Sequence, residues 1–268
     1  MKLGFIGAGN MAGAIIKGFI NKNCVNSSDI YFIRQNKEKQ AEQAKELGIN
    51  GCDDYDSLIE NSDILFLGVK PVVFPTLLLQ IAKSVKKKNP LVVSMAAGLT
   101  TDSIKEMLGY DAKIIRIMPN VNAAIAMSTT AVCKNEFASD EDLATIKNLF
   151  STIGLTTEVP ENQFAIFTAI AGCSPAYVYM FIDGLARGAQ KMGMNKQKAL
   201  EIAASAVIGS ASMYAQSNEH PQELVDKVCS PGGTTIEGVT TLEEYKFTAG
   251  VVKAVENSIL KDRELSKK

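Results

Sequence analysis

The stretch CSPGGTT, residues 229–235, places hydroxyl side chains beside a proline and two consecutive glycines. These residues interrupt a helix, and apolar residues at helical spacing lie on both sides of them. We therefore predict a rigid turn at which a new helix begins. Backbone N–H groups at such a turn form a concave site for an anion such as a carboxylate, contributed here by Gly232, Gly233, Thr234 and Thr235. The hydroxyls of Ser230 and Thr235 add donors and acceptors, whereas a simple helix cap would use only one hydroxyl.

A second constellation, GFIGAGNMAGAI at residues 4–15, has the glycine spacing of a dinucleotide-binding turn. Gly7 allows the tight turn, Gly9 lets the backbone approach a pyrophosphate, and the small Ala12 lets the following helix pack closely on the strand. The start of that helix presents unpaired N–H groups to the phosphates. We predict that the cofactor contacts Ile6, Gly7, Ala8, Gly9, Asn10 and Met11.

The residues after the next predicted strand, IYFI at 30–33, indicate which dinucleotide is bound. An acidic residue there would accept a hydrogen bond from the ribose 2′-hydroxyl, but the chain places Arg34, Asn36 and Lys37 at this point. Arginine grips a phosphate with two parallel hydrogen bonds, and lysine adds a point charge. We therefore predict NADPH as the preferred cofactor, with NADH also accepted.

Three further strand ends are expected at the same edge of the sheet, because ligands of open α/β sheets bind outside the carboxyl ends of the strands. Two of them supply predicted cofactor contacts, namely Val69, Lys70, Pro71, Met95, Ala96 and Ala97. The third, Met118 to Asn120, is expected to border the nicotinamide.

The elements that must hold these residues fall into two parts. Up to about residue 160 seven short apolar runs are predicted as strands, with helical patterns between the early ones, which is typical of a doubly wound parallel sheet. These runs are LGFIG, IYFI, DILFLGV, LVVSMA, KIIRIM, TTAVC and TTEV. Beyond residue 160 the apolar residues follow the helical period. We predict an α/β fold in which a Rossmann-like domain, residues 1–160, precedes an all-α domain, residues 161–268. Small residues at helix-packing spacing between 199 and 210 favour association of the helical part with a second copy.

Composition limits the partners and the location. The net charge of −1 in 268 residues gives no electrostatic footprint for nucleic acid or for an anionic membrane. Five cysteines without a C-x-x-C pair favour neither disulfides nor a metal site and fit a reducing compartment. We expect a cytoplasmic protein. His220 is the single histidine, and its place before Pro221 favours a structural or capping role over catalysis.

Taken together, the motifs IGAGNMA, VKP, SMAAG, IRIMPN, SPAYVYMFID, EHPQELVDKVCSPGGTTIEGV and RELSKK resemble the pyrroline-5-carboxylate reductase family along nearly the whole chain. The resemblance implies NADPH-dependent reduction of 1-pyrroline-5-carboxylate to L-proline, the last step of proline biosynthesis. It also implies a helical dimerisation domain, with dimers that assemble into decamers in many members. Ser230 and Thr235 would line the carboxylate and the imine as the catalytic residues. The chain departs from the family pattern at Ala171, Cys173 and Cys229, where serines are frequent.

Two other functions are compatible with parts of the pattern. An NADP-dependent dehydrogenase of the β-hydroxyacid type also joins a glycine-rich turn to a helical domain, but it needs a catalytic lysine, for which Lys191 and Lys196 are available. A non-catalytic NADP-binding sensor would not need the hydroxyls and glycines of CSPGGTT. Reduction of a cyclic imine requires no histidine, because the imine is basic enough to take its proton largely from solvent.

Overall fold

The computed structural model describes residues 1–265, so residues 266–268 of the predicted second domain lie outside the described part. Contacts divide the chain into two compact units. The first comprises Met1–Gly172 together with the end of the chain from Ile259, and the second comprises Cys173–Ser258. The domain division after residue 160 stays a prediction. It marks the end of the strand pattern, and the last strand of the described chain, Gly154–Glu158, lies just before it.

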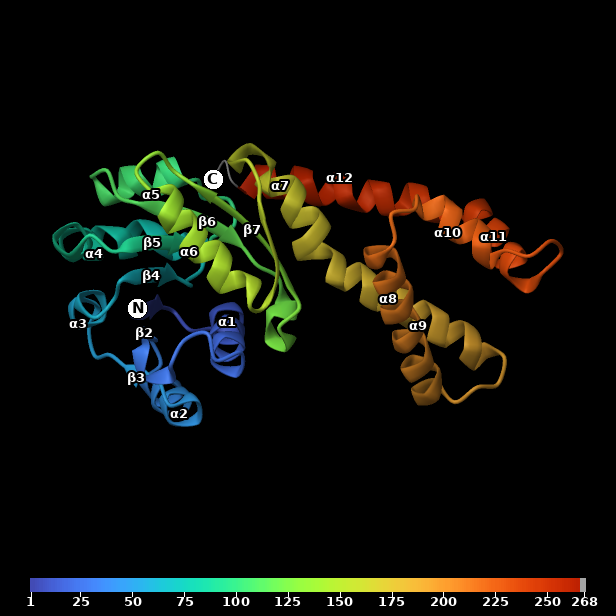
Figure 1. The fold of residues 1–268 in the computed structure, drawn as a ribbon, viewed down its shortest axis with the longest axis horizontal. Coiled ribbons are helices and arrows are strands. Elements are labelled where there is room, and N and C mark those ends of the chain that lie inside the picture. The colour runs from blue at the N-terminus through green and yellow to red at the C-terminus, as the bar shows by residue number, and fades with distance from the viewer. Residues whose placement is uncertain (266–268) are drawn as a thin grey trace. The chain divides into compact units, whose positions relative to one another are not determined.

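The first unit contains one sheet with the strand order β3-β2-β1-β4-β5-β6-β7-β8 (Figure 1). All seven strands predicted from the sequence are confirmed, and the two-residue strand β3 was not predicted. The strands are β1 (Leu3–Ile6), β2 (Ile30–Ile33), β3 (Asn50–Gly51), β4 (Ile64–Leu67), β5 (Leu91–Ser94), β6 (Ile114–Met118), β7 (Ser128–Lys134) and β8 (Gly154–Glu158). The order reverses between β1 and β4, which is where the doubly wound folds bind their ligands.

The expectation of a parallel sheet is correct from β3 to β6 and wrong for the last two strands. β7 pairs with β6 in the antiparallel direction, and β8 pairs with β7 in parallel. The connection from β6 to β7, residues 119–127, is shorter than the crossover of about a dozen residues that a parallel pair needs. The chain therefore turns back directly beside β6.

Helices cover both faces of this sheet. The residues of β1, β2, β4, β5 and β6 alternate between two hydrophobic clusters, as when Phe5 and Phe66 stack 4.6 Å apart on one face while Leu65 and Leu67 pack on the other. The first face is covered by α1 (Asn10–Asn21), α2 (Lys37–Leu47) and α6 (Asp140–Ser151). The second is covered by α3 (Tyr55–Glu60), α4 (Phe74–Lys88) and α5 (Thr101–Leu108). Burial on both faces explains why the strands read as nearly continuous apolar runs.

The second unit is helical, as the sequence predicted. Its helices are α8 (Ser174–Lys191), α9 (Lys196–Gln216), α10 (Pro221–Val228), α11 (Thr234–Glu244) and the part of α12 (Phe247–Leu265) that precedes residue 259. Ala186 of α8 and Ala199 and Ala203 of α9 are buried. Small side chains at this contact let the two helices pack closely. The Tyr177 hydroxyl lies 2.6 Å from the Ser258 hydroxyl and ties α8 to α12.

Much apolar surface of these helices stays uncovered in one chain. Met180, Ile208 and Met213 are each more than 60% exposed. The helical run Glu161–Lys191 is long and apolar enough, by length and composition alone, to cross a membrane, yet only 17% of its most apolar window is buried. A soluble chain rarely leaves so much apolar surface in contact with water, so this surface fits contact with a partner.

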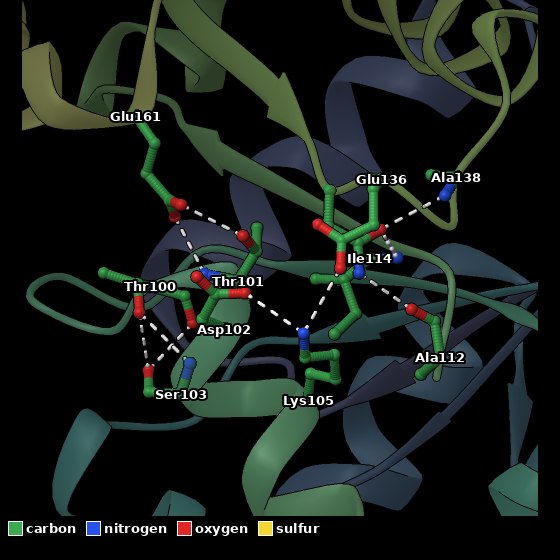
Figure 2. Close-up of polar contacts among 11 residues, drawn as sticks. Thr100, Thr101, Asp102, Ser103, Lys105, Ala112, Ile114, Glu136, Ala138 and Glu161 are labelled. Carbon is green, nitrogen blue, oxygen red and sulfur yellow. Dashed lines mark hydrogen bonds and ion pairs between the residues drawn. The ribbon is translucent and has the colours of Figure 1, made fainter. Parts of the chain in front are cut away.

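A buried ion pair joins the sheet to the segment that leads into the helices. Arg116 of β6 is 5% exposed, and its Nη1 lies 3.2 Å from the carboxylate of Glu161 in the 3-10 turn Glu161–Gln163. Figure 2 shows the same carboxylate reaching the first residue of α5, where it accepts from the backbone N–H of Thr101 at 2.8 Å and from its hydroxyl at 3.0 Å. Glu161 therefore holds three elements together.

We expect Glu161→Gln to lower the free energy of unfolding by about 1 to 3 kcal/mol, because it leaves the Arg116 guanidinium buried without its closest carboxylate. Urea denaturation of the purified protein measures this change. The matched control is Glu60→Gln, since Glu60 pairs with Lys87 at 3.4 Å but both side chains are more than two-thirds exposed. That variant should lose less than about 1 kcal/mol. Equal losses in the two variants would contradict a structural role for the buried pair.

Candidate active site

The glycine-rich turn between β1 and α1 has the tight geometry that the sequence predicted. Gly7 has a φ of +85°, and its N–H donates to the carbonyl oxygen of Ile33 at 3.0 Å. A Cβ on Gly7 would lie 2.8 Å from the side chain of Val69 and 2.9 Å from the carbonyl oxygen of Gly68. Both the dihedral angle and the close approach to the end of β4 therefore require glycine at this position.

Gly9, unlike Gly7, has open space beside it, which suits the pyrophosphate contact predicted for it. It is the N-cap residue of α1, and no side chain caps the first turn of the helix. A Cβ on Gly9 would meet no atom within 4 Å, so the space beside the helix start is open. Open space next to uncapped N–H groups is what a pyrophosphate needs for a close approach.

A cavity of about 460 Å³ lies beside this turn. Four of the predicted cofactor residues line it: Ala8, Gly9, Asn10 and Arg34. Arg34 directly follows β2, so its side chain stands at the carboxyl end of the strand. The cavity also receives Lys39 and Gln43 of α2, which the sequence reasoning did not single out. Polar residues of a surface helix are expected to face water, so no sequence signal marked these two.

The other residues predicted near the adenosine ribose have structural partners of their own. Asn36 caps α2, and its side chain accepts from the backbone N–H of Lys39 at 2.8 Å. The ammonium of Lys37 donates to the carbonyl oxygens of Cys52 and Asp53, each at 3.2 Å, and Lys37 does not line the cavity. The basic residue that reaches the cavity from this helix is Lys39.

The remaining predicted cofactor residues lie around the carboxyl ends of β1, β4 and β5. These strands are neighbours and parallel, so their carboxyl ends share one edge of the sheet. Their exposure differs, because Ile6 and Ala96 are buried, Met11, Val69 and Met95 are half-buried, and Lys70, Pro71 and Ala97 are exposed. The exposed residues are those that a ligand at this edge could reach.

Asn120, at the end of β6, has a structural role that the sequence did not reveal. Its side chain is 4% exposed and donates to the carbonyl oxygen of Ala171 at 3.0 Å. Its Oδ1 accepts from the backbone N–H groups of Asn122 and Thr129. Ala171 belongs to a π-helical turn, Thr168–Cys173, which carries two of the departures from the family pattern. Asn120 thus holds a wide helical turn, a feature that is often found at functional sites.

The turn CSPGGTT separates two helices of the second unit, as predicted. α10 ends at Val228 and α11 begins at Thr234 after the N-cap residue Gly233. The N–H of Gly233 donates to the carbonyl oxygen of Ser230 at 3.0 Å, which closes the turn. A Cβ on Gly233 would overlap the Ser230 hydroxyl and lie 3.1 Å from the Ser230 carbonyl oxygen, so a glycine here lets the hydroxyl keep its position.

The hydroxyls of this turn are not used to cap the helix. No side chain caps α11, and within residues 1–265 the hydroxyls of Ser230, Thr234 and Thr235 form no hydrogen bond. Ser230 and Thr234 are exposed and Thr235 is half-buried. The turn therefore presents unpaired hydroxyls together with the free N–H groups of a helix start. This combination can bind a carboxylate and orient a neighbouring polar atom.

Two residues considered for other roles have clear structural partners. His220 is the N-cap of α10, where its Nδ1 accepts from the backbone N–H of Gln222 at 3.3 Å, so the predicted capping role is confirmed. Lys196 donates to Asp183 at 2.6 Å, and hydrogen bonds from Lys196 and Arg187 lower the pKa of the Asp183 carboxyl. A lysine held in such an ion pair is poorly suited to act as a general base.

The two buried thiols, Cys52 and Cys133, are unreactive because they stay protonated. Burial raises the pKa of the Cys133 thiol to about 12, and the nearby Glu161 carboxylate adds to this shift. Burial also raises the pKa of Cys52. Both groups stay protonated at neutral pH and cannot act as thiolate nucleophiles. The described residues hold no group of three His, Cys, Asp or Glu side chains that could bind a metal ion.

The Rossmann sheet, the glycine turn and the cavity beside Arg34 define a dinucleotide-dependent oxidoreductase. Comparison with known families agrees. The family model for pyrroline-5-carboxylate reductase dimerisation matches residues 161–265, and the model for NADP oxidoreductase, coenzyme F420-dependent, matches residues 2–98. The dimerisation match supports homo-oligomerisation through the helical part of the chain.

Individual relatives cover the whole chain. Pyrroline-5-carboxylate reductase of Escherichia coli strain K12 is 41% identical over 99% of this chain and 98% of its own length. The crystal structure of the Streptococcus pyogenes reductase is 38% identical, with a TM-score of 0.89 over 98% of both chains. The Plasmodium falciparum enzyme, solved with NADP bound, is 29% identical, with a TM-score of 0.90 over 99% of this chain and 98% of its own. The chain belongs to the pyrroline-5-carboxylate reductase family.

We expect Gly9→Ala to fold normally but to bind NADPH about 10- to 100-fold more weakly, because the methyl group occupies the space where the pyrophosphate would approach. The backbone of Gly9, with φ −72° and ψ −159°, is accessible to alanine, so the free energy of unfolding should change by less than about 1 kcal/mol. Fluorescence titration with NADPH and thermal unfolding measure the two quantities.

The contrasting variant is Gly7→Ala, in which the methyl group collides with Val69 and Gly68. It should lose stability as well as binding. A Gly9→Ala protein that binds NADPH as tightly as the unaltered protein would rule out pyrophosphate contact at this turn.

Proposed function

We propose that this chain reduces 1-pyrroline-5-carboxylate to L-proline with NADPH, with NADH as a poorer donor, in the last step of proline biosynthesis. The observation that carries the proposal is the turn from Cys229 to Thr235, in which a helix start without a side-chain cap lies beside three unpaired hydroxyls. Membership of the family and the identity to named reductases support the same reaction.

The residues of the first unit fit the cofactor. The uncapped start of α1 and the open space beside Gly9 would receive the pyrophosphate. Arg34 would bind the 2′-phosphate, with Lys39 as a second cation at the same cavity. The exposed residues at the ends of β4 and β5, Lys70, Pro71 and Ala97, would border the rest of the dinucleotide. The bound nicotinamide supplies the hydride.

The turn in the second unit would hold the substrate. The free N–H groups of Gly232, Thr234 and Thr235 would bind the carboxylate, with the Ser230 hydroxyl as an additional donor. The N–H of Gly233, which the sequence also suggested, is already bonded to the Ser230 carbonyl oxygen within the turn. The Thr235 hydroxyl would hydrogen-bond the imine nitrogen and so fix the orientation of the C=N bond. Positioning of this kind carries most of the rate when the reacting atoms are held at about 3 to 3.5 Å. No histidine lies in the turn, which suits an imine protonated from solvent.

The supporting residues limit the alternatives. Of the two lysines that a β-hydroxyacid-type dehydrogenase could use, Lys196 is paired with Asp183, which leaves Lys191 as the candidate for that alternative. A non-catalytic NADP sensor would have no use for the unpaired hydroxyls of Ser230 and Thr235. We also propose that the protein is cytoplasmic and binds neither nucleic acid nor a membrane, because the net charge of −1 gives no overall attraction to a polyanion and the apolar helices match a dimerisation model.

We propose that two copies cover the exposed apolar faces of α8 and α9, and that five such dimers can form a decamer. Light scattering at micromolar concentration should give at least twice the mass of one chain, because the apolar surface that one chain leaves exposed is too large for a stable monomer. A stable and active monomer would contradict this assembly.

We expect Thr235→Val to lower kcat/KM for 1-pyrroline-5-carboxylate roughly 10- to 100-fold, because the variant keeps the shape of the side chain but loses one oriented hydrogen bond in the transition state. NADPH affinity should change little. Oxidation of NADPH, followed by its absorbance, measures the rate, and a 3-oxoacid and a reaction without substrate serve as controls.

The matched control is Thr234→Val, which removes the neighbouring hydroxyl but keeps the backbone N–H that would bind the carboxylate. It should affect kcat/KM much less than Thr235→Val. Unchanged turnover in Thr235→Val would reduce the turn to a helix start without a catalytic role. Oxidation of NADPH with the 3-oxoacid and not with the imine would overturn the proposed reaction.

A further inference from the structure

Arg34 is held at two points by glutamines of α2. Its backbone N–H donates to Oε1 of Gln40 at 2.8 Å, and Gln40 is itself anchored by a bond from Nε2 to the carbonyl oxygen of Cys52 at 2.8 Å. Its guanidinium donates from Nη1 to Oε1 of Gln43 at 2.7 Å. The first contact holds the chain after β2, and the second holds the charged end of the side chain.

Gln43 has little freedom to move. It is 8% exposed, although α2 is a surface helix with many charged residues. A Cβ on Gly13 of α1 would lie 3.4 Å from Nε2 of Gln43, so the amide fills the space between α1 and Arg34. An amide confined in this way keeps Oε1 directed at the guanidinium. The contact therefore orients Arg34 before any ligand arrives.

The partner of Arg34 is neutral, although carboxylates are close. Glu42 and Glu46 line the same cavity, and Glu46 pairs with Lys17 at 2.7 Å. Within residues 1–265 Arg34 forms no ion pair, and Gln43 is the only hydrogen-bond partner of its guanidinium. A guanidinium has five N–H donors, so most of them remain for a ligand. The full positive charge also remains, because an amide oxygen does not neutralise it.

We propose that Gln43 is a positioning residue that determines the cofactor preference of this chain. It orients the Arg34 guanidinium toward the cavity without neutralising it, so the remaining N–H groups bind a 2′-phosphate. This inference rests on the proposed NADPH-dependent function. A glutamate at this position would fit the same space but would form an ion pair with Arg34 and repel the phosphate.

The test uses two ligands that differ mainly by the 2′-phosphate and that need no imine substrate. Adenosine 2′,5′-bisphosphate and adenosine 5′-monophosphate are titrated by calorimetry into the unaltered protein and into Gln43→Glu. We expect Gln43→Glu to weaken binding of the bisphosphate about 10- to 100-fold, a loss typical of a charge-assisted contact, with little change for the monophosphate. The ratio of kcat/KM for NADPH to that for NADH should fall by a similar factor.

Three further variants separate orientation from charge and from folding. Ala41→Glu adds the same charge on an exposed position of α2 and should change the ratio little. Gln43→Met keeps the approximate size but removes the acceptor, and should weaken bisphosphate binding less than Gln43→Glu. Arg34→Ala removes the phosphate contact altogether and so gives the largest loss of bisphosphate binding that is expected. Thermal unfolding of each variant confirms that it is folded.

The inference is overturned if Gln43→Glu and Ala41→Glu have the same effect, or if Gln43→Glu weakens both ligands equally. It is also overturned if the unaltered protein does not prefer the bisphosphate, since Arg34 would then bind no phosphate. A protein that prefers the bisphosphate, loses that preference in Gln43→Glu and fails to reduce 1-pyrroline-5-carboxylate supports the inference while refuting the proposed reaction.

Discussion

The close contact between the turn after β1 and the end of β4 sets the geometry of the cofactor side of this molecule. A Cβ on Gly68 would overlap the carbonyl oxygen of Gly7 and lie 3.0 Å from the Cβ of Ala12. Only small residues allow the two strand ends and the start of α1 to come this close. The order of the sheet reverses at this place, between β1 and β4. The cavity, the uncapped start of α1 and Arg34 all depend on this approach.

The starts of the helices show where the chain leaves backbone N–H groups for a ligand. Six helices of the described chain, α2, α3, α5, α6, α9 and α10, begin with a side-chain cap, supplied by Asn36, Asp54, Thr100, Ser139, Asn195 and His220. By contrast, α1 and α11 begin after extended chain at the glycines Gly9 and Gly233 without a side-chain cap. Three other helices, α4, α8 and the short α7 (Phe164–Phe167), also lack a cap, but each continues from a preceding helical turn. The starts of α1 and α11 lie within the two motifs that the sequence predicts to bind ligands. An uncapped start leaves its N–H groups for an anion, which in our proposal is a phosphate in one unit and a carboxylate in the other.

Two arginines of the first unit, Arg116 and Arg34, have partners of different charge. Arg116 is buried against Glu161 and a phenylalanine ring, so its charge is neutralised within the framework of the first unit. Arg34 is held by an amide and keeps its charge for a ligand. The same residue type thus serves stability at one position and, as we propose, ligand binding at another, and the difference lies in the partner that the fold supplies.

The sequence alone was sufficient to predict the elements and the motifs, because both depend on local patterns. Apolar runs marked the seven longer strands, the helical period marked the second half, and the spacing of Gly7, Gly9 and Ala12 marked the dinucleotide turn.

The residues that support those motifs could not be predicted in this way. Gln40, Gln43 and Lys39 look like ordinary surface residues of an amphipathic helix, and only the packing of α2 beside β2 brings them to Arg34. Three other features likewise depend on which segments meet in space. They are the antiparallel direction of β7, the hydrogen bonds of Asn120 and the unpaired hydroxyls near Gly233. Contacts between residues distant in sequence carry no local pattern, so the tertiary structure was needed to find them.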